Sequence, residues 1–304
     1  MPTPPLPLGL ERVLAVSNNK GGVGKTTTAA NIAGLAAAGG IRTLAVDFDP
    51  QGNLGVDLGL ERQDGLQLRR ALEDGAPLPI TMDPQRENLG VVQSGPRLEE
   101  IISLQLGRGY GAPSLAALLH QSLAAVIDDW DLVVIDTSPG HRPLVEAAFS
   151  VAQGVVLLSR TDERSYDGVE QTARWFQAVH ESTNPEVQLL GVALFDVGTQ
   201  AKKIEAGARQ TLNEMLEGLA FDPAVFTNRI RHASGAAVDT RMRGRLVHEL
   251  EGDVAQAHQA RFQAIREGKQ PSFHARSLDG LAGDYQGLTE EILTRLQSLI
   301  PEEA

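Results

Sequence analysis

The stretch Lys20-Gly21-Gly22-Val23-Gly24-Lys25-Thr26-Thr27 decides how the rest of the chain is interpreted. An apolar run at residues 13–16 precedes it, and a helix-prone run at residues 28–36 follows it. Strand, glycine-rich loop and helix in this order are the context that a phosphate-binding loop requires. Glycine lets successive backbone N–H groups turn toward an anion at the positive end of a helix. The sequence therefore predicts a site for the phosphates of a nucleotide.

The residue types in this stretch have separate expected tasks. The Lys25 ammonium would neutralise β- and γ-phosphate oxygens, and the Thr26 hydroxyl would ligate Mg²⁺. The predicted nucleotide-binding residues are Gly21, Gly22, Val23, Gly24, Lys25, Thr26 and Thr27.

The loop departs from the ordinary phosphate-binding motif at one position. Five residues before Gly24 stands Asn19 instead of glycine, and a second lysine, Lys20, follows it. The pattern K-G-G-V-G-K-T-T resembles the deviant Walker A motif of the ParA/MinD family of P-loop ATPases. The resemblance implies ATP and Mg²⁺ as cofactors, hydrolysis of ATP to ADP and phosphate, and a catalytic role for Lys20 across a dimer interface.

Two acidic residues follow the next apolar strand, which is expected at residues 43–46. Ligands of open α/β sheets lie beyond the carboxyl ends of the strands, where Asp47 and Asp49 fall. The run D-F-D-P-Q-G at residues 47–52 resembles switch I of the same family. The resemblance implies that Asp49 positions the attacking water. Asp47 is expected to act indirectly, either near magnesium or in shaping the loop.

A third acidic position ends the apolar strand expected at residues 131–136. An acid at the carboxyl end of a buried parallel strand fits a Walker B site. Asp136 is therefore predicted to hold magnesium through water or through Thr26. The family usually reads D-x-P-P here, and Ser138 replaces the first of these prolines.

Alternating strands and helices predict an α/β protein with the P-loop NTPase fold, a mostly parallel twisted sheet with helices on both faces. Further strands are expected at residues 88–94, 154–159, 187–195 and 226–231. Further helices are expected at residues 65–72, 114–127, 142–150, 199–216 and 281–300, with one more between residues 159 and 187. The predicted organisation is a flexible arm at residues 1–11 and one domain at residues 12–304, with an insertion at residues 251–275.

Composition limits the possible partners. The 304 residues include no cysteine, which excludes disulfides and thiolate metal sites, and a reducing cytoplasmic location is expected. No apolar run reaches the roughly 18 residues of a membrane span. The formal net charge of −12 makes the chain a poor overall attractant for nucleic acid, so any DNA contact must come from a local patch.

The densest cluster of basic residues in this acidic chain is a group of arginines. It consists of Arg229, Arg231, Arg241, Arg243 and Arg245. ParA relatives bind DNA without sequence preference through arginines in this region, so the resemblance implies the same use here. The alternative is a solvated segment whose arginines pair with the acidic body of the protein.

The resemblance as a whole predicts a ParA-type ATPase that dimerises with ATP and Mg²⁺ and binds double-stranded DNA nonspecifically. Such a protein would associate with the nucleoid and segregate a plasmid, chromosome or other cargo, together with a centromere-binding ParB-like partner. About ten residues precede the first strand, so no N-terminal helix-turn-helix domain is expected. Two alternatives remain: a MinD-like ATPase that cycles on membranes, which the acidic end disfavours, and a P-loop small-molecule kinase or ligase.

Overall fold

The computed structural model describes residues 9–107, 112–198, 200–218, 225–233, 243–250 and 280–299. The strands are β1 Val13–Ser17, β2 Thr43–Phe48, β3 Ile80–Met82, β4 Leu89–Val92, β5 Leu132–Thr137, β6 Gly154–Ser159 and β7 Gln188–Leu194. The helices are α1 Lys25–Ala38, α2 Asn53–Asp57, α3 Leu66–Asp74, α4 Glu100–Gly107, α5 Leu115–Ala124, α6 Arg142–Val151, α7 Glu163–Ser182, α8 Lys202–Gly218 and α11 Leu281–Gln297. Two 3₁₀ turns, η1 Pro96–Glu99 and η2 Ile127–Asp129, complete the described elements.

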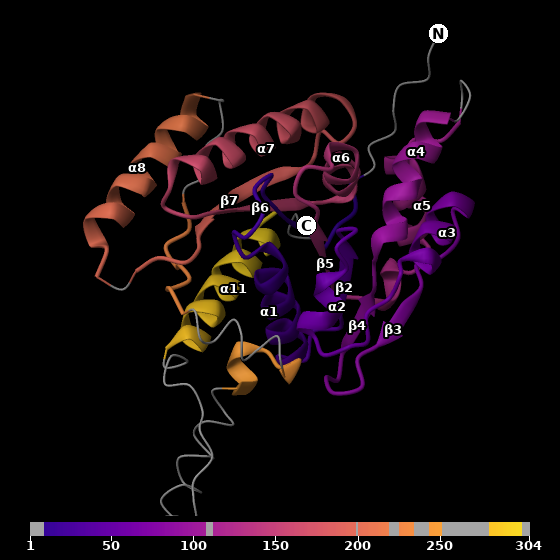
Figure 1. The fold of residues 1–304 in the computed structure, drawn as a ribbon, viewed down its shortest axis with the longest axis horizontal. Coiled ribbons are helices and arrows are strands. Elements are labelled where there is room, and N and C mark those ends of the chain that lie inside the picture. The colour runs from indigo at the N-terminus through magenta and orange to yellow at the C-terminus, as the bar shows by residue number, and fades with distance from the viewer. Residues whose placement is uncertain are drawn as a thin grey trace, which may run out of the picture.

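The described strands form one seven-stranded sheet in the order β3-β4-β2-β5-β1-β6-β7 (Figure 1). Every neighbouring pair is parallel except β3 and β4, which are antiparallel. The predicted mostly parallel α/β fold is therefore confirmed. The strand β1 lies between β5 and β6, so the loop that leaves its carboxyl end is flanked by the ends of both.

Alternating side chains of the sheet enter two separate apolar cores. In β1, Val13 and Ala15 join one core, whereas Leu14 and Val16 join the other. The first core is covered by α3, α5, α6, α7 and α8, and the second by α1, α2 and α11. Figure 1 shows α1 and α11 side by side against the sheet. Because both faces are covered, the central strands are mostly apolar, which explains why the sequence alone predicts them as apolar runs.

Most predicted elements are confirmed within a few residues, but the strand expected at residues 226–231 is wrong. The described chain there makes only isolated bridges, Val192 with Val225 and Val197 with Arg231. The backbone N–H groups of Thr227 and Asn228 donate instead to the Glu291 carboxylate of α11, at 2.9 and 3.0 Å. Phe226 and Ile230 still donate to the carbonyl oxygens of Val192 and Leu194, so Glu291 interrupts the pairing with β7 only at Thr227 and Asn228.

Other differences concern short elements and chain ends. The sequence did not predict β3, α2 or α4, and β3 has only three residues, two of them exposed. Helix α8 begins at Lys202 rather than at residue 199. Most of the expected arm and the whole expected insertion at residues 251–275 lie outside the described residues.

A buried ionic cluster joins the loop after β3 to the segment at residues 243–250. The Arg86 guanidinium contacts Asp83 at 2.9 Å and Glu249 at 2.7 Å. It also donates to the carbonyl oxygens of Leu58 and Gly244, at 2.8 and 3.1 Å. The Arg86 side chain is 6% exposed and that of Asp83 is fully buried, so this cluster is shielded from solvent.

We expect Arg86→Met to lower the free energy of unfolding by about 3 kcal/mol, because it leaves the buried Asp83 without its counter-charge and Glu249 with only the partly exposed Arg245. Urea unfolding at neutral pH would measure the decrease. The matched control is Arg174→Met, because Arg174 pairs with Glu170 on an exposed surface. That control should cost less than about 0.5 kcal/mol. Equal decreases in both variants would contradict a stabilising role for the buried cluster.

Candidate functional site

The glycine-rich loop connects β1 to α1 and needs glycine for two physical reasons. Gly22 and Gly24 have φ angles of 75° and 85°, which residues with a Cβ rarely adopt. A Cβ on Gly24 would also lie 2.3 Å from the Phe195 ring. The ring at the end of β7 therefore presses directly on the loop, a contact that the sequence did not indicate.

Side chains from neighbouring elements anchor the start of the loop. The Asn18 amide donates to the Leu158 carbonyl oxygen of β6, and its Oδ1 accepts from the Lys20 N–H at 2.7 Å. The Asn19 N–H donates to the Thr172 hydroxyl of α7 at 2.9 Å. The loop is thus held by hydrogen bonds to β6 and α7.

Lys25 is buried at the first position of α1. Its Nζ donates to the Lys20 carbonyl oxygen at 3.0 Å, so the side chain folds back over the loop. Burial lowers the pKa of Lys25, while the charges of Asp136 and Asp49 raise it. An ammonium that loses hydration here is stabilised by anions, which is the property needed to bind phosphate oxygens.

Asp47 shapes the loop after β2. Its two carboxylate oxygens accept from the N–H groups of Asp49 and Leu54, at 3.1 and 2.9 Å. Burial raises its pKa well above the ordinary value, and Asp136, its register partner on β5, raises it further. Of the two indirect roles expected from the sequence, the geometry supports the one in the loop.

Asp49 lies one residue beyond the end of β2 and is also buried. Its Oδ1 accepts from the Gln51 N–H at 3.0 Å. Burial raises the pKa of Asp49, whereas Lys25, Ser138 and His141 lower it. Asp49 therefore faces both the phosphate-binding lysine and the segment that follows β5.

Asp136 is fully buried, and neither carboxylate oxygen has a hydrogen-bond partner in the part of the chain that the structure describes. Burial raises its pKa to about 7; Thr26 and Lys25 lower it. The Thr26 hydroxyl is near enough to act on this pKa, but it makes no hydrogen bond of normal geometry with the carboxylate. An unpartnered carboxylate beside a threonine hydroxyl fits hydrated Mg²⁺, which prefers oxygen ligands.

Among the described residues, no group of three or more His, Asp or Glu side chains forms a metal site by itself. Magnesium at Asp136 would consequently need oxygen ligands from the nucleotide and from water, as in other nucleotide-dependent sites.

Lys20 is held within its own subunit. Its Nζ contacts the Asp162 carboxylate at 2.6 Å and the Ser165 hydroxyl at 2.9 Å. Asp162 also caps α7 by accepting from the Ser165 N–H. The lysine charge that the sequence assigned to a second subunit is therefore paired here, and reaching a partner would require this contact to break.

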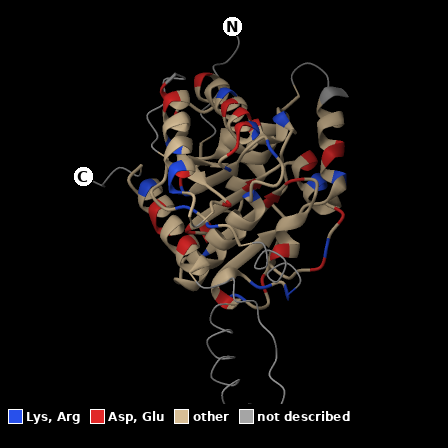
Figure 2. Cartoon of the chain, turned by 60° about the vertical axis from the view of Figure 1, so that its left-hand side comes forward, with Lys and Arg blue, Asp and Glu red and all other residues tan. Residues whose placement is uncertain are grey.

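Three of the predicted DNA-binding arginines are also paired with carboxylates. Arg229 contacts Glu205 at 2.9 Å, Arg231 contacts Asp284 at 2.6 Å, and Arg245 contacts Glu249 at 3.1 Å. Arg243 is exposed, and Arg241 lies outside the described residues. Basic and acidic residues are interspersed over the view in Figure 2. The basic concentration in the sequence is thus largely compensated by local carboxylates in three dimensions.

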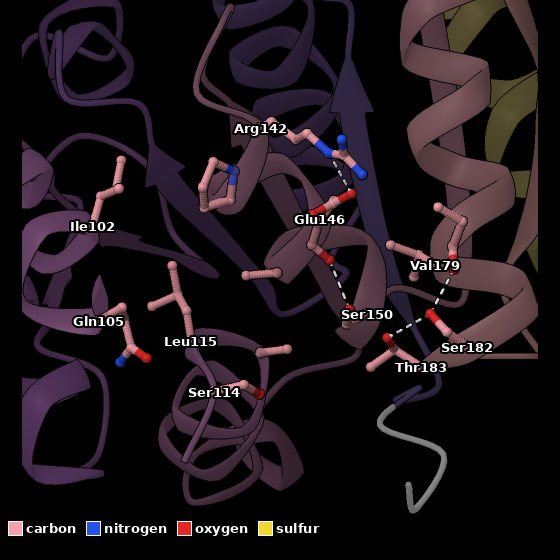
Figure 3. Close-up of a pocket in the computed structure, with 14 residues that line it drawn as sticks. Ile102, Gln105, Ser114, Leu115, Arg142, Glu146, Ser150, Val179, Ser182 and Thr183 are labelled. Carbon is pink, nitrogen blue, oxygen red and sulfur yellow. Dashed lines mark hydrogen bonds and ion pairs between the residues drawn. The ribbon is translucent and has the colours of Figure 1, made fainter. Parts of the chain in front are cut away.

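A cavity among the described residues adjoins the loop region. It measures about 180 Å³ and lies next to Thr27, the last residue of the motif. Its lining is Thr27, Arg160, Phe195, Asp196, Ile230, Arg231, His232, Ala233, Val247, Leu281 and Tyr285. Another cavity, of about 470 Å³, lies between α4 and α5 on one side and α6 and α7 on the other (Figure 3). The second cavity contains none of the predicted site residues.

Comparisons with known proteins agree with this geometry. A family model described as an AAA domain matches residues 11–189. The chromosome-partitioning ATPase Soj of Thermus thermophilus is 34% identical over 206 residues, covering 67% of this chain and 78% of Soj. The chain belongs to the ParA/MinD family of P-loop ATPases. Among ParA/MinD proteins it is most similar to the ParA branch, to which chromosome-partitioning relatives such as Soj belong.

Solved structures share the ParA/MinD fold over nearly the whole chain. Apo McdA from Cyanothece superimposes with a TM-score of 0.73 at 20% identity, covering 93% of this chain and 100% of McdA. MinD from Pyrococcus horikoshii in complex with Mg-ADP gives a TM-score of 0.66 at 17% identity, covering 96% and 100%. At these identities the similarity concerns the fold alone. No helix among the described residues is both long and apolar enough to cross a membrane.

Several residues around the ParA-like loop were not singled out from the sequence. They are Asn18, Thr137, Asp162, Phe195, His141 of the segment after β5, and Glu99 of η1. Asn18 and Thr137 adjoin recognised motifs, so proximity in sequence was an available signal. Phe195, Asp162 and Glu99 come from distant elements, and only the folded chain brings them to the loop.

We expect Asp136→Asn to stabilise the protein in the absence of nucleotide and magnesium. The folded-state pKa of about 7 exceeds the unfolded value of 3.8, so ionising Asp136 costs stability as pH rises from about 4 to 7. The variant should therefore gain up to about 4 kcal/mol in free energy of unfolding at pH 8, and less at pH 5.

Urea unfolding at both pH values would test this expectation. The control is Asp128→Asn, because Asp128 is exposed and should change stability little at either pH. A variant at position 136 that is less stable than the parent at pH 8 would show that Asp136 is stabilised by interactions rather than left unpartnered.

Proposed function

We propose that this protein is a ParA-like ATPase that binds ATP with Mg²⁺, dimerises in that state and hydrolyses ATP to return to monomers. The observation that carries the proposal is the convergence of Lys25, Asp49 and Asp136 at the carboxyl ends of three adjacent strands. Each of these residues acts electrostatically on at least one of the others, although they are far apart in sequence. Perturbed ionisable groups that meet in this way are typical of a catalytic site.

The residues divide the work as follows. The N–H groups of residues 21–27 and the Lys25 ammonium bind the phosphates, and Thr26 and Asp136 hold hydrated magnesium. Magnesium, when bound, withdraws charge from the β- and γ-phosphate oxygens. The Asp49 carboxylate accepts a hydrogen bond from the attacking water and so aims its lone pair at the γ-phosphate. The cavity beside Thr27 is the proposed site of the nucleoside.

Lys20 is the proposed link between nucleotide and assembly. In a dimer its Nζ would exchange the Asp162 carboxylate for the phosphates of the nucleotide bound to the second subunit. The exchange replaces one ionic contact with a stronger, multiply charged partner, which makes it favourable only while the triphosphate is present. Hydrolysis would return Lys20 to Asp162.

Two variants separate nucleotide binding from chemistry. Lys25→Ala should weaken ATP binding by roughly 100-fold or more, because it removes a charge-assisted hydrogen bond to phosphate. Asp49→Ala should keep the affinity within a few fold and slow turnover by roughly 100-fold, because it removes only the group that orients water. Calorimetric titration and steady-state ATPase assays measure the two quantities. Wild-type turnover in Asp49→Ala would refute the assigned role.

Assembly is tested in the slow variant. With ATP and Mg²⁺, Asp49→Ala should give a dimeric mass by light scattering, and with ADP a monomeric mass. Adding Lys20→Ala should lower dimerisation, whereas Arg174→Ala, which alters an exposed pair on α7, should not. A monomeric mass with ATP throughout the micromolar range would refute the dimer.

We further propose that the dimer binds double-stranded DNA without sequence preference through Arg229, Arg231, Arg241, Arg243 and Arg245, and that it segregates DNA or another cargo in the cytoplasm with a ParB-like partner. The support is the resemblance and the partitioning function in the names of the relatives. A handful of phosphate contacts per subunit gives weak binding, which dimer closure on one duplex would strengthen.

Arg243 is the most informative residue to change. In Arg231→Glu the new carboxylate would repel Asp284, so a loss of stability could not be distinguished from a loss of DNA binding. We expect Arg243→Gln in the ATP-trapped dimer to weaken binding equally for two unrelated duplexes. The slope of affinity against salt should fall by about 1 for each arginine–phosphate interaction that the substitution removes. The control Arg174→Gln should leave both quantities unchanged. Weaker binding to only one duplex would contradict nonspecific recognition.

A further inference from the structure

The segment after β5 brings a hydroxyl to the side of Asp49. Phe48 and Thr137 are register partners of β2 and β5, so Asp49 and Ser138 leave the two strands side by side. Ser138 is fully buried and near enough to lower the pKa of Asp49 as a hydrogen-bond donor, but its Oγ makes hydrogen bonds of normal geometry only with Pro139 and His141 among the described residues. Where Ser138 stands, the motif of the family has a proline. This chain therefore has a hydrogen-bond donor beside the carboxylate that a proline would not supply.

The Ser138 hydroxyl has one proton and more than one acceptor around it. Its Oγ lies 2.6 Å from Nδ1 of His141 and 3.3 Å from the Pro139 carbonyl oxygen, and the Asp49 carboxylate is close by. A proton donated to one acceptor is withheld from the others. The state of the His141 ring consequently decides whether Ser138 donates to Asp49.

Glu99 selects the state of that ring. The Glu99 Oε1 lies 2.9 Å from Nε2 of His141. A carboxylate only accepts hydrogen bonds, so Nε2 carries the imidazole proton and Nδ1 of the neutral ring is left as an acceptor. Nδ1 can then take the Ser138 proton. Glu99 comes from η1, so an element distant in sequence sets the orientation of a hydroxyl beside Asp49.

A second donor would impair Asp49. One of its oxygens, Oδ1, already accepts from the Gln51 N–H. A Ser138 hydroxyl turned to the carboxylate would compete with the attacking water for the remaining acceptor positions.

We propose that Glu99 and His141 are positioning residues that hold the Ser138 proton on His141 and so leave Asp49 free to accept a hydrogen bond from water. This inference rests on the proposed role of Asp49 in hydrolysis. It makes the serine and the histidine a compensating pair: His141 is needed only because residue 138 carries a hydroxyl.

The test is a double-mutant cycle in the full-length protein, with kcat and KM for ATP measured at each corner. His141→Leu should lower kcat about tenfold with KM unchanged, because Ser138 then donates to Asp49. Ser138→Ala should stay within twofold of the wild type. The double variant should recover to within twofold as well. His141→Asn should retain activity, because its side-chain carbonyl can accept from Ser138.

A general structural role for His141 predicts different results. In that case the double variant would be as slow as His141→Leu or slower, and this outcome would overturn the proposal. Equal decreases of kcat in Ser138→Ala and His141→Leu would also overturn it, because they would mean that the hydroxyl itself assists hydrolysis.

A second measurement does not depend on turnover. The ¹⁵N chemical shifts of His141 at pH 8 should report a proton on Nε2 in the wild type and a shift toward the other tautomer in Glu99→Leu. A proton on Nδ1 in the wild type would overturn the proposal. Absence of ATP hydrolysis by the wild type, with the expected tautomer present, would instead refute the proposed ATPase function and the catalytic use of the pair together.

Discussion

The structure depends on the burial of acidic side chains at the carboxyl ends of the central strands β2 and β5. Asp47 and Asp136 are register partners on adjacent strands, and both are fully buried. Like charges at this distance are unfavourable unless a proton or a cation separates them. Asp47 is stabilised by two backbone N–H groups, whereas Asp136 has no partner among the described residues. The fold therefore accepts a cost at Asp136 that a bound cation would remove, as expected for a site whose ligand completes it.

Several lysine and arginine side chains elsewhere form ion pairs with carboxylates. Lys20, Arg229, Arg231 and Arg245 each meet a carboxylate that approaches from another part of the chain or from the next helical turn. These contacts are partly exposed, so each is worth little and can be exchanged for a more highly charged partner. Phosphate groups of a nucleotide or of DNA are such partners. These ion pairs offset the positive charges within the chain, and they are weak enough for the lysine and arginine side chains to bind phosphate instead.

Packing around the glycine-rich loop restricts which residues could be there. The Phe195 ring fills the space that a side chain on Gly24 would need, and Asn18 links the loop to β6. Such contacts fix the conformation of the loop, which reduces the entropic cost of ordering it around a ligand. Ser138 represents the opposite case, because it adds a donor where the family motif has proline. Its partner His141 and the more distant Glu99 compensate for that change by hydrogen bonding.

The sequence by itself determined the fold class, the positions of the buried strands and the motif residues Lys25, Thr26, Asp49 and Asp136. It could do so because parallel strands covered on both faces are largely apolar, and because the motif residues lie at or beyond the carboxyl ends of those strands. Only the tertiary structure decided that Thr227 and Asn228 donate to the Glu291 side chain, that Lys20 binds Asp162, and that Glu99 reaches His141. These contacts join residues 42 to 142 positions apart. No local pattern encodes such pairs, since their geometry arises from the packing of whole helices against the sheet.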